Sequence, residues 1–415
     1  MTEGPPATAT AALRSAAARI STTGPALQAL GSDRVASAIA RAAAALSRSG
    51  SEVAEDARRA LGESTGLSDE MVRWALETTL GPADEPALRA LAEHLRAPLP
   101  WAVVARARLA VLVLAGNVFT APFRAICLPL LSGVPVVAKA SSRDDVFPRL
   151  LSAALRAVDA EVGRSFEVFT FPRGSTALLD ALVSQADVVS AYGSDATLAE
   201  LRGRLSATTT FVSHGHGVGV AYVPEAALQR DPGETAARIA LDVAAYDQRG
   251  CLSPHAVFVD GGATRRARDF AAALSEALGG LASRLPRGVL PVEMGAAQLQ
   301  WRGVAAVRGE LFEGDGWAVS FEGEGPLRLS PGYRNVSVLA CDAAQLGRRL
   351  LPLGAHLKAL GVAGDEHARR ALAERLPAPL CPRVSDVGAM QSPPLDSLAD
   401  GADPFTGLVR WTQVD

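Results

Sequence analysis

Cysteine is scarce in this sequence, and its four copies are far apart. They stand at positions 127, 251, 341 and 381, and no CxxC pair occurs in the 415 residues. A secreted disulfide framework and a zinc site both depend on closely spaced cysteine pairs, so neither is indicated. Isolated thiols persist best in a reducing compartment, and a cytoplasmic location is therefore expected.

An excess of positive charge and long apolar runs are lacking as well. The 41 Lys and Arg residues are balanced by 44 Asp and Glu, for a formal net charge of −3, so no nucleic-acid surface is indicated. No apolar stretch reaches the roughly 18 residues that a membrane span requires. The N-terminus lacks the basic and then apolar pattern of a signal peptide.

What the sequence does contain is the alternation of an α/β protein. After a lead of about ten residues expected to be disordered, the first hundred residues show helical spacing of Ala, Leu, Arg and Glu. Short apolar runs follow, separated by helical stretches, at 108–115, 134–139, 168–171 and 187–191. Such a series predicts right-handed crossovers and a parallel sheet. A further β segment, broken by the His-Gly-His-Gly stretch at 214–217, is expected over 209–223, a helix over 234–246 and strands over 256–259 and 408–411.

Cys251 is the strongest candidate nucleophile. It follows Gly250 in a short polar loop, Asp247-Gln-Arg-Gly-Cys, between an expected helix and an expected strand. A loop on a rigid scaffold exposes a nucleophile, and the glycine lets the Cys251 N–H point at a substrate oxygen. The alternative is a buried structural cysteine, but the polar residues before Cys251 argue against a core position.

Three further positions follow expected strands: Asn117, Lys139 and the pair Gly193-Ser194. Ligands of open α/β sheets bind at the carboxyl ends of the strands. An Asn amide there can donate to an oxyanion, a lysine can meet a ribose or a phosphate, and a helix N-terminus can face a pyrophosphate. Each also has a structural explanation, as a turn residue, a solvated lysine and a helix cap. The pair His214 and His216 has no third ligand nearby, so no metal site is expected.

The order of these residues along the chain resembles that in the aldehyde dehydrogenase superfamily. Within the superfamily, the sequence is most similar to the bacterial fatty acyl-CoA reductases that supply aldehyde for luminescence. The resemblance spans about residues 101–415. The closer likeness is carried by Ala115-Gly-Asn-Val, Val136-Val-Ala-Lys-Ala-Ser-Ser-Arg-Asp, Tyr246-Asp-Gln-Arg-Gly-Cys-Leu-Ser-Pro, Gly388-Ala-Met-Gln-Ser-Pro-Pro-Leu and Leu408-Val-Arg-Trp-Thr.

The resemblance implies an α/β fold with a Rossmann-type parallel-sheet cofactor domain, a second α/β catalytic domain and a C-terminal strand arm. We therefore expect an N-terminal helical segment over 1–100, a dinucleotide-binding domain over 101–222 and a catalytic domain with Cys251 over 223–376. Residues 377–415 would return to the cofactor domain and form an oligomerisation arm. A homo-oligomer or a complex with an acyl-transfer partner is expected.

The resemblance also implies a reaction. Cys251 would take the acyl group from an acyl-CoA or acyl-carrier thioester, and the Asn117 amide with the Cys251 N–H would hold the oxyanion. A nicotinamide cofactor would lie near Lys139 and Ser141, with its pyrophosphate near Gly193 and Ser194. A hydroxyl at Ser141 or Ser142 beside Lys139 favours NADPH over NADH.

Two departures from the superfamily shape this expectation. Aldehyde-oxidising members carry a Glu that activates water, whereas the corresponding stretch here is Val212-Ser-His-Gly-His-Gly. Reduction is therefore favoured over hydrolysis, with His214 or His216 as candidate proton-transfer groups. The Glu that holds the nicotinamide ribose has no clear counterpart, and Glu293, Glu313 and Glu322 are alternatives. Open alternatives for the protein are an acyl-phosphate or semialdehyde dehydrogenase and a non-catalytic subunit.

Overall fold

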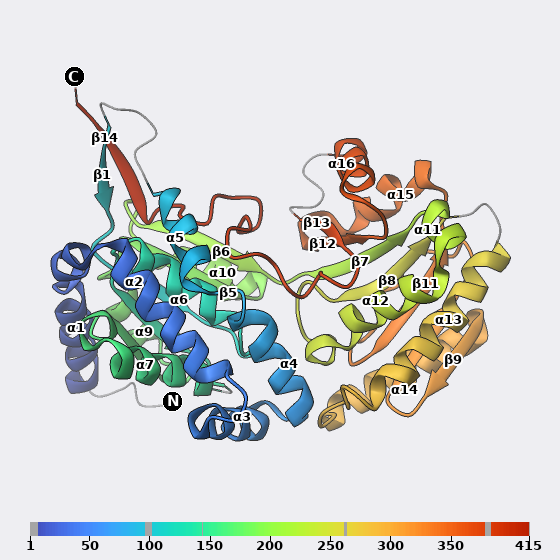
Figure 1. The fold of residues 1–415 in the computed structure, drawn as a ribbon, viewed down its shortest axis with the longest axis horizontal. Coiled ribbons are helices and arrows are strands. Elements are labelled where there is room, and N and C mark those ends of the chain that lie inside the picture. The colour runs from blue at the N-terminus through green and yellow to red at the C-terminus, as the bar shows by residue number, and fades with distance from the viewer. Residues whose placement is uncertain (1–6, 96–101, 143, 261–263, 378–382, 415) are drawn as a thin grey trace. The chain divides into compact units, whose positions relative to one another are not determined.

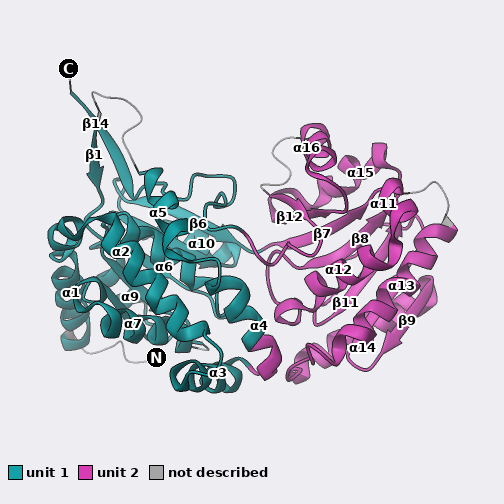
Figure 2. Cartoon of the chain, viewed as in Figure 1, with its two compact units in different colours: residues 1–65, 73–216, 394–415 teal, residues 66–72, 217–393 magenta. Residues whose placement is uncertain are grey.

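The computed structural model describes residues 7–95, 102–142, 144–260, 264–377 and 383–414. The chain divides into two compact units (Figure 2). Unit 1 comprises Met1–Thr65, Arg73–His216 and Pro394–Asp415, and unit 2 comprises Gly66–Val72 and Gly217–Pro393. The change of unit after His216 comes six residues before the domain boundary expected from the sequence.

Unit 1 contains a five-stranded sheet whose strands are all parallel, in the order β4-β3-β2-β5-β6. The predicted βα series and its parallel sheet are therefore confirmed. The strands are β2 (Ala110–Val113), β3 (Val136–Ala140), β4 (Phe166–Thr170), β5 (Val188–Gly193) and β6 (Thr210–Gly215), and the connecting helices are α6 (Pro122–Leu131), α7 (Val146–Val158), α8 (Ala160–Gly163), α9 (Thr176–Val183) and α10 (Asp195–Arg202).

The N-terminal segment is helical, as its residue spacing predicts. It forms α1 (Ala7–Ser21), α2 (Gly24–Ser47), α3 (Glu52–Thr65), α4 (Asp69–Leu80) and α5 (Glu85–Glu93). The expected disordered lead is wrong for residues 7–10, which already belong to α1, and residues 1–6 lie outside the described chain. Leu13 and Ala17 of α1 belong to the same buried cluster as Val111 and other residues of the sheet. Among the described helices, none is long and apolar enough to cross a membrane.

Unit 2 contains a seven-stranded sheet in the order β13-β12-β7-β8-β11-β10-β9, in which only the β9–β10 pair is antiparallel. Its strands are β7 (Val218–Val223), β8 (Pro254–Val259), β9 (Glu310–Gly314), β10 (Trp317–Phe321), β11 (Asn335–Ala340), β12 (Leu357–Val362) and β13 (Val384–Asp386). The β segment expected over 209–223 is interrupted at the expected break, and its two parts, β6 and β7, belong to different sheets.

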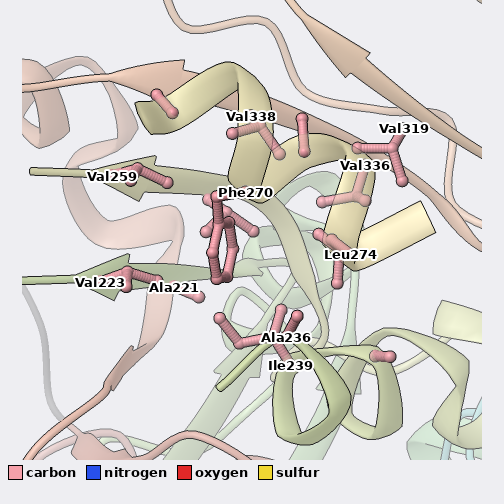
Figure 3. Packing of buried hydrophobic residues seen from close by; sticks show 14 of the residues in the cluster. Ala221, Val223, Ala236, Ile239, Val259, Phe270, Leu274, Val319, Val336 and Val338 are labelled. Atoms are coloured by element: carbon pink, nitrogen blue, oxygen red, sulfur yellow. The ribbon is translucent and has the colours of Figure 1, made fainter. Parts of the chain in front are cut away.

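Helices α12 (Pro232–Ala244) and α13 (Thr264–Ala282) pack on this sheet and close the core of unit 2. Phe270 and Leu274 of α13 lie against strand residues such as Val259 and Val338 (Figure 3). Burying each such side chain stabilises the fold by about 1.5–3 kcal/mol. The other helical elements of the unit are α11 (Glu225–Arg230), η1 (Ala245–Gln248), α14 (Val292–Arg308), α15 (Ala343–Leu350), η2 (Leu351–His356) and α16 (Glu366–Arg375).

The strand expected at 408–411 is confirmed as β14 (Val409–Gln413). It pairs antiparallel with β1 (Ala102–Arg106) in a two-stranded sheet (Figure 1). The register places Val104 opposite Trp411. The end of the chain thus returns to unit 1 and pairs with the segment that precedes the parallel sheet.

Candidate active site

Cys251 lies in a turn between η1 and β8, and it is exposed. The other described cysteines differ sharply from it. Cys127 and Cys341 are buried, and burial raises the pKa of the Cys127 thiol far above its ordinary value and that of Cys341 to about 11. A cysteine must ionise to act as a nucleophile, so Cys251 is the best placed of the three. Cys381 lies outside the described residues.

The backbone that leads into this turn is strained. Tyr246, Asp247 and Gln248 have φ angles of 52°, 51° and 60°, in the left-handed region that side chains other than glycine rarely adopt. Each such residue costs about 1–3 kcal/mol and persists only where the surroundings impose it. The polar loop that the sequence singled out therefore has an imposed and unusual conformation.

A close backbone contact supports the turn from β7. A Cβ built on Gly219 would lie 2.3 Å from the Leu252 carbonyl oxygen, so only glycine fits there. The Gly219 N–H donates to the Ser253 oxygen at 2.9 Å. Gly219 therefore fixes the position of Leu252 and Ser253, the two residues that follow Cys251. This role could not be predicted from the sequence, because the residues around Gly219 form no motif that indicates it.

The carboxyl edge of the parallel sheet gathers the expected cofactor residues of unit 1. Lys139 of β3 is opposite Val113 of β2, and Asn117 is exposed in the loop after β2. A Cβ on Gly116 would lie 2.9 Å from the Ser141 Oγ, so the loops after β2 and β3 touch. Asn117, Lys139 and Ser141 thus come from adjacent strand ends.

Gly193 ends β5, the strand on the other side of β2, and Ser194 caps α10. The Ser194 Oγ accepts from the Thr197 N–H at 3.4 Å and lies 2.9 Å from the Thr197 Oγ1. The capping explanation for Ser194 is therefore correct in geometry, and the helix N-terminus still faces the same edge of the sheet as Lys139.

Arg173, in the loop after β4, is a residue that the sequence analysis missed. Its guanidinium donates to the Thr197 Oγ1. Burial lowers the pKa of Lys139, and the positive charge of Arg173 lowers that pKa further. The Lys139 Nζ also lies 5.4 Å from the centre of the Phe171 ring. Within the described chain neither cation has an ion-pair partner. A Pro-Arg-Gly turn directly after a predicted strand was the available signal.

His214 and His216, at the end of β6, have different surroundings. The His214 Nδ1 lies 3.0 Å from an Asp400 carboxylate oxygen, its Nε2 lies 3.2 Å from the Ser190 Oγ, and its ring stacks on Tyr192. His214 therefore ties the C-terminal segment to the sheet. His216 is exposed. In the part of the chain that the structure describes, no group of three His, Cys, Asp or Glu residues could hold a metal ion.

The three glutamates considered for the nicotinamide ribose all belong to unit 2. Glu322 is nearly buried and accepts from the Arg308 Nε at 2.7 Å, so its carboxylate is engaged in the fold. Glu313 lies 3.5 Å from an Arg302 nitrogen and is more exposed, and Glu293 is exposed in the first turn of α14. Glu322 is consequently the least available of the three.

Several solved structures similar to this chain are aldehyde dehydrogenases. Aldehyde dehydrogenase 21 from Physcomitrella patens, in complex with succinate, has a TM-score of 0.73 at 14% identity, over 96% of this chain and 88% of that one. AldA indole-3-acetaldehyde dehydrogenase of P. syringae, in complex with NAD+ and IAA, has a TM-score of 0.74 at 14% identity, over 97% and 88%. An NAD-dependent benzaldehyde dehydrogenase from Corynebacterium glutamicum has 0.71 at 14%, over 97% and 90%.

These similarities show the aldehyde dehydrogenase fold and confirm the expected fold class. No curated protein sequence matches the chain. Residues 103–411 match the family described as Acyl-CoA reductase (LuxC), which is well over half of the chain. Family and fold together support oxidoreductase chemistry at aldehyde or acyl groups. The chain therefore belongs to the acyl-CoA reductase (LuxC) family.

Proposed function

We propose that this protein reduces an acyl-CoA, or a related acyl thioester, to the aldehyde through a thioacyl-enzyme on Cys251. The observation that carries the proposal is the contrast among the cysteines. Cys251 is exposed at the end of a strained polar loop, whereas burial raises the thiol pKa of both Cys127 and Cys341. The family match over residues 103–411 supports the acyl substrate.

In the proposed reaction the Cys251 thiolate attacks the thioester carbonyl carbon and forms a new C–S bond. The bond to coenzyme A breaks, and coenzyme A leaves as a thiolate that takes up a proton. The family resemblance assigns the oxyanion to the Asn117 amide and the Cys251 backbone N–H, and one such donor typically supplies about 3 kcal/mol. When bound, the nicotinamide cofactor supplies the hydride that releases the acyl group as an aldehyde.

Hydrolysis of the acyl-enzyme has no evident support at the stretch where oxidising relatives carry their base. That stretch is the end of β6, where both ring nitrogens of His214 are engaged by Asp400 and Ser190. A proton-transfer role for His214 would require breaking one of these contacts. His216 is the more accessible of the two histidines.

The residues at the carboxyl edge of the parallel sheet fit a phosphorylated dinucleotide. Lys139 and Arg173 are close enough for one charge to lower the pKa of the other, and the described chain gives neither a carboxylate. Two neighbouring cations without an anion favour a dianionic ligand such as a 2′-phosphate. We therefore propose NADPH as the preferred cofactor, with Lys139 and Arg173 on the phosphate and Ser194 at the pyrophosphate.

The experiment is incubation of the purified protein with a panel of acyl-CoAs and NADPH or NADH, following loss of the reduced cofactor's absorbance. Acyl-CoA alone should leave an acyl mass on Cys251, and Cys251→Ala should abolish both the adduct and turnover. Cys341→Ala is the matched control and should retain the adduct. If no acyl chain gives either turnover or an adduct, the proposal is rejected. If only acyl phosphates are turned over, the substrate is an acyl phosphate and not a thioester.

We further propose that the β1–β14 sheet is a contact surface between copies of this chain. Within the described chain it consists of two strands, and it leaves Val103 57% and Trp411 40% exposed. An open strand edge beside exposed apolar side chains is a template for further pairing. Light scattering should show an oligomer that Trp411→Lys weakens, and a wild-type monomer at all concentrations would reject this surface.

A further inference from the structure

Two strained segments of unit 2 are connected by an ion pair and hydrogen bonds, and one of them directly precedes the Cys251 turn. Of the six non-glycine residues with positive φ in the described chain, five lie in these segments, at 246–248 and 333–334. Tyr333 and Arg334 have φ angles of 52° and 66°. Backbone of this kind persists where surrounding contacts impose it, and it concentrates at functional sites.

A buried ion pair forms one half of the connection. Arg334 donates to the same Asp247 carboxylate oxygen from Nε at 3.1 Å and from Nη2 at 2.8 Å. The second Asp247 oxygen accepts from the Gly288 N–H at 3.0 Å, and the Arg334 Nη1 donates to the Leu285 oxygen at 2.7 Å. Asp247 and Arg334 are thereby fixed in orientation as well as in charge.

The Gln248 amide forms the other half. Its oxygen accepts from the Asn335 N–H at 3.0 Å, and its nitrogen donates to the Asn335 oxygen at 2.8 Å. The same nitrogen donates to the Pro254 oxygen at 2.7 Å. Gln248 precedes Cys251 by three residues and Pro254 follows it by three, so one amide ties together the two ends of the turn.

The residues that form the connection are buried, whereas the thiol-bearing residue between them is exposed. Asp247, Gln248 and Arg334 are exposed by 1%, 3% and 2%, whereas Cys251 between the tied ends is exposed. Contacts that served only the core would not require the chain to enter the left-handed region directly before the thiol. Holding a nucleophile in one orientation does require such a rigid support.

We propose that Asp247 and Gln248, held by Arg334 and Asn335, are positioning residues that fix the orientation of Cys251 for attack on an acyl group. The proposal rests on the proposed function only in taking Cys251 as the reactive thiol. It predicts that loss of the connection slows acyl transfer to Cys251, which lowers kcat, while KM changes little in every variant that still folds.

The test measures two reactions of the full-length protein: acylation of Cys251 by an activated aryl ester, followed by mass spectrometry, and steady-state reduction of acyl-CoA. Gln248→Met keeps the side-chain length and removes its hydrogen bonds. It should slow acylation by about tenfold or more, since small displacements of reacting groups can cost about 100-fold, with KM within about threefold. Arg334→Lys, which keeps the charge facing Asp247, should fall between Gln248→Met and wild type.

Tyr222→Phe is the matched control, because it removes one partly buried hydrogen bond in the same unit, from the Tyr222 hydroxyl to Asp260 at 3.0 Å. It should acylate at the wild-type rate. If Gln248→Met does not fold, Gln248→Asn replaces it, since this amide buries no charge and is one methylene too short to keep the same hydrogen bonds. Wild-type acylation rates in the folded Gln248 variant, or a loss matched by Tyr222→Phe, would overturn the proposal.

Failure of the proposed function gives a different result. In that case the wild-type protein would not reduce any acyl-CoA, yet the aryl ester would still acylate Cys251 and the Gln248 variant would still be slower. The aryl ester needs neither coenzyme A recognition nor the cofactor, so the two failures are distinguishable.

Discussion

Arg334 and Asp247 form an ion pair whose side chains are only 3% and 1% exposed, with Arg334 Nη2 2.8 Å from the Asp247 Oδ1. The two residues are 87 positions apart, and the pair joins the loop before Cys251 to the segment before β11. Burial lowers the pKa of Arg334, and the Asp247 carboxylate opposes that shift. The Asp247 carboxylate therefore offsets part of the cost of burying the Arg334 charge.

Removing one partner should cost far more stability than removing both. Arg334→Met alone leaves Arg249, whose Nη2 lies 3.4 Å from the Asp247 Oδ2, as the remaining cation beside the buried carboxylate, and it should destabilise the fold by about 3 kcal/mol. The double variant Asp247→Asn with Arg334→Met should recover part of this loss. Chemical denaturation followed by fluorescence measures both, and additive losses in the double variant would contradict the prediction.

Arg173→Ala should reduce the preference for a phosphorylated cofactor. Losing a charge-assisted hydrogen bond of about 1.5–3 kcal/mol should weaken 2′-AMP binding by about tenfold or more, with 5′-AMP binding nearly unchanged. Calorimetric titration of the two nucleotides gives this ratio without catalysis. Arg164→Ala, at an exposed position in the same unit, is the control. Equal losses for both nucleotides would show that Arg173 does not select the phosphate.

Asp242 should make the stability of unit 2 depend on pH. Burial raises the pKa of this carboxyl to about 7, although the Gly388 and Met390 N–H groups oppose the shift. A group with a raised folded pKa contributes stability that is present below its unfolded value, about 3.9, and is lost as the pH rises through the folded value. The melting temperature should therefore fall between about pH 4 and pH 7 because of this group.

Asp242→Asn tests that assignment, because the amide cannot titrate. The variant loses one acceptor for a backbone N–H and should be less stable overall, but its melting temperature should vary less over the same pH interval. The difference between the two curves isolates Asp242 from the other carboxyls. Parallel curves would mean that Asp242 stays ionised in the folded protein.

Gly219→Ala should be severely damaging, because its Cβ would lie 2.3 Å from the Leu252 carbonyl oxygen and 2.8 Å from the Leu252 carbonyl carbon. The backbone must move, so we expect activity to fall by about 100-fold through displacement of the Cys251 turn. Gly280→Ala in α13 is the matched control, since nothing lies within 4 Å of its built Cβ. That change should stabilise the helix by up to about 1 kcal/mol. A fully active Gly219→Ala variant would refute the close contact.

The sequence predicted the features that depend on local periodicity. Alternating apolar runs and helical stretches correctly gave the βα series of unit 1, because a parallel strand buried on both faces must be continuously apolar. The position of Cys251 in an exposed turn could be predicted for a similar reason, since Asp247-Gln-Arg-Gly is too polar for a core strand. The early start of α1 was missed because residues 7–10 are small and threonine-rich and carry no apolar spacing.

The division of 209–223 into strands of two different sheets was not predictable from local pattern. Both halves read as β structure, and only the pairing partners, β5 for one and β8 and β12 for the other, separate them. Arg173 was missed for a similar reason. Its importance comes from lying beside Lys139, 34 positions earlier in the chain, and no periodicity encodes that proximity.

The sequence by itself determined the order of the elements, the family resemblance and the identity of the exposed thiol, because these follow from residue type and spacing along the chain. Only the tertiary structure decided what surrounds that thiol: Gly219 beneath the turn, and Arg334 and Asn335 holding Asp247 and Gln248 in a strained conformation. Strain of this kind is imposed by contacts between segments far apart in the chain, and a local sequence pattern does not predict such contacts.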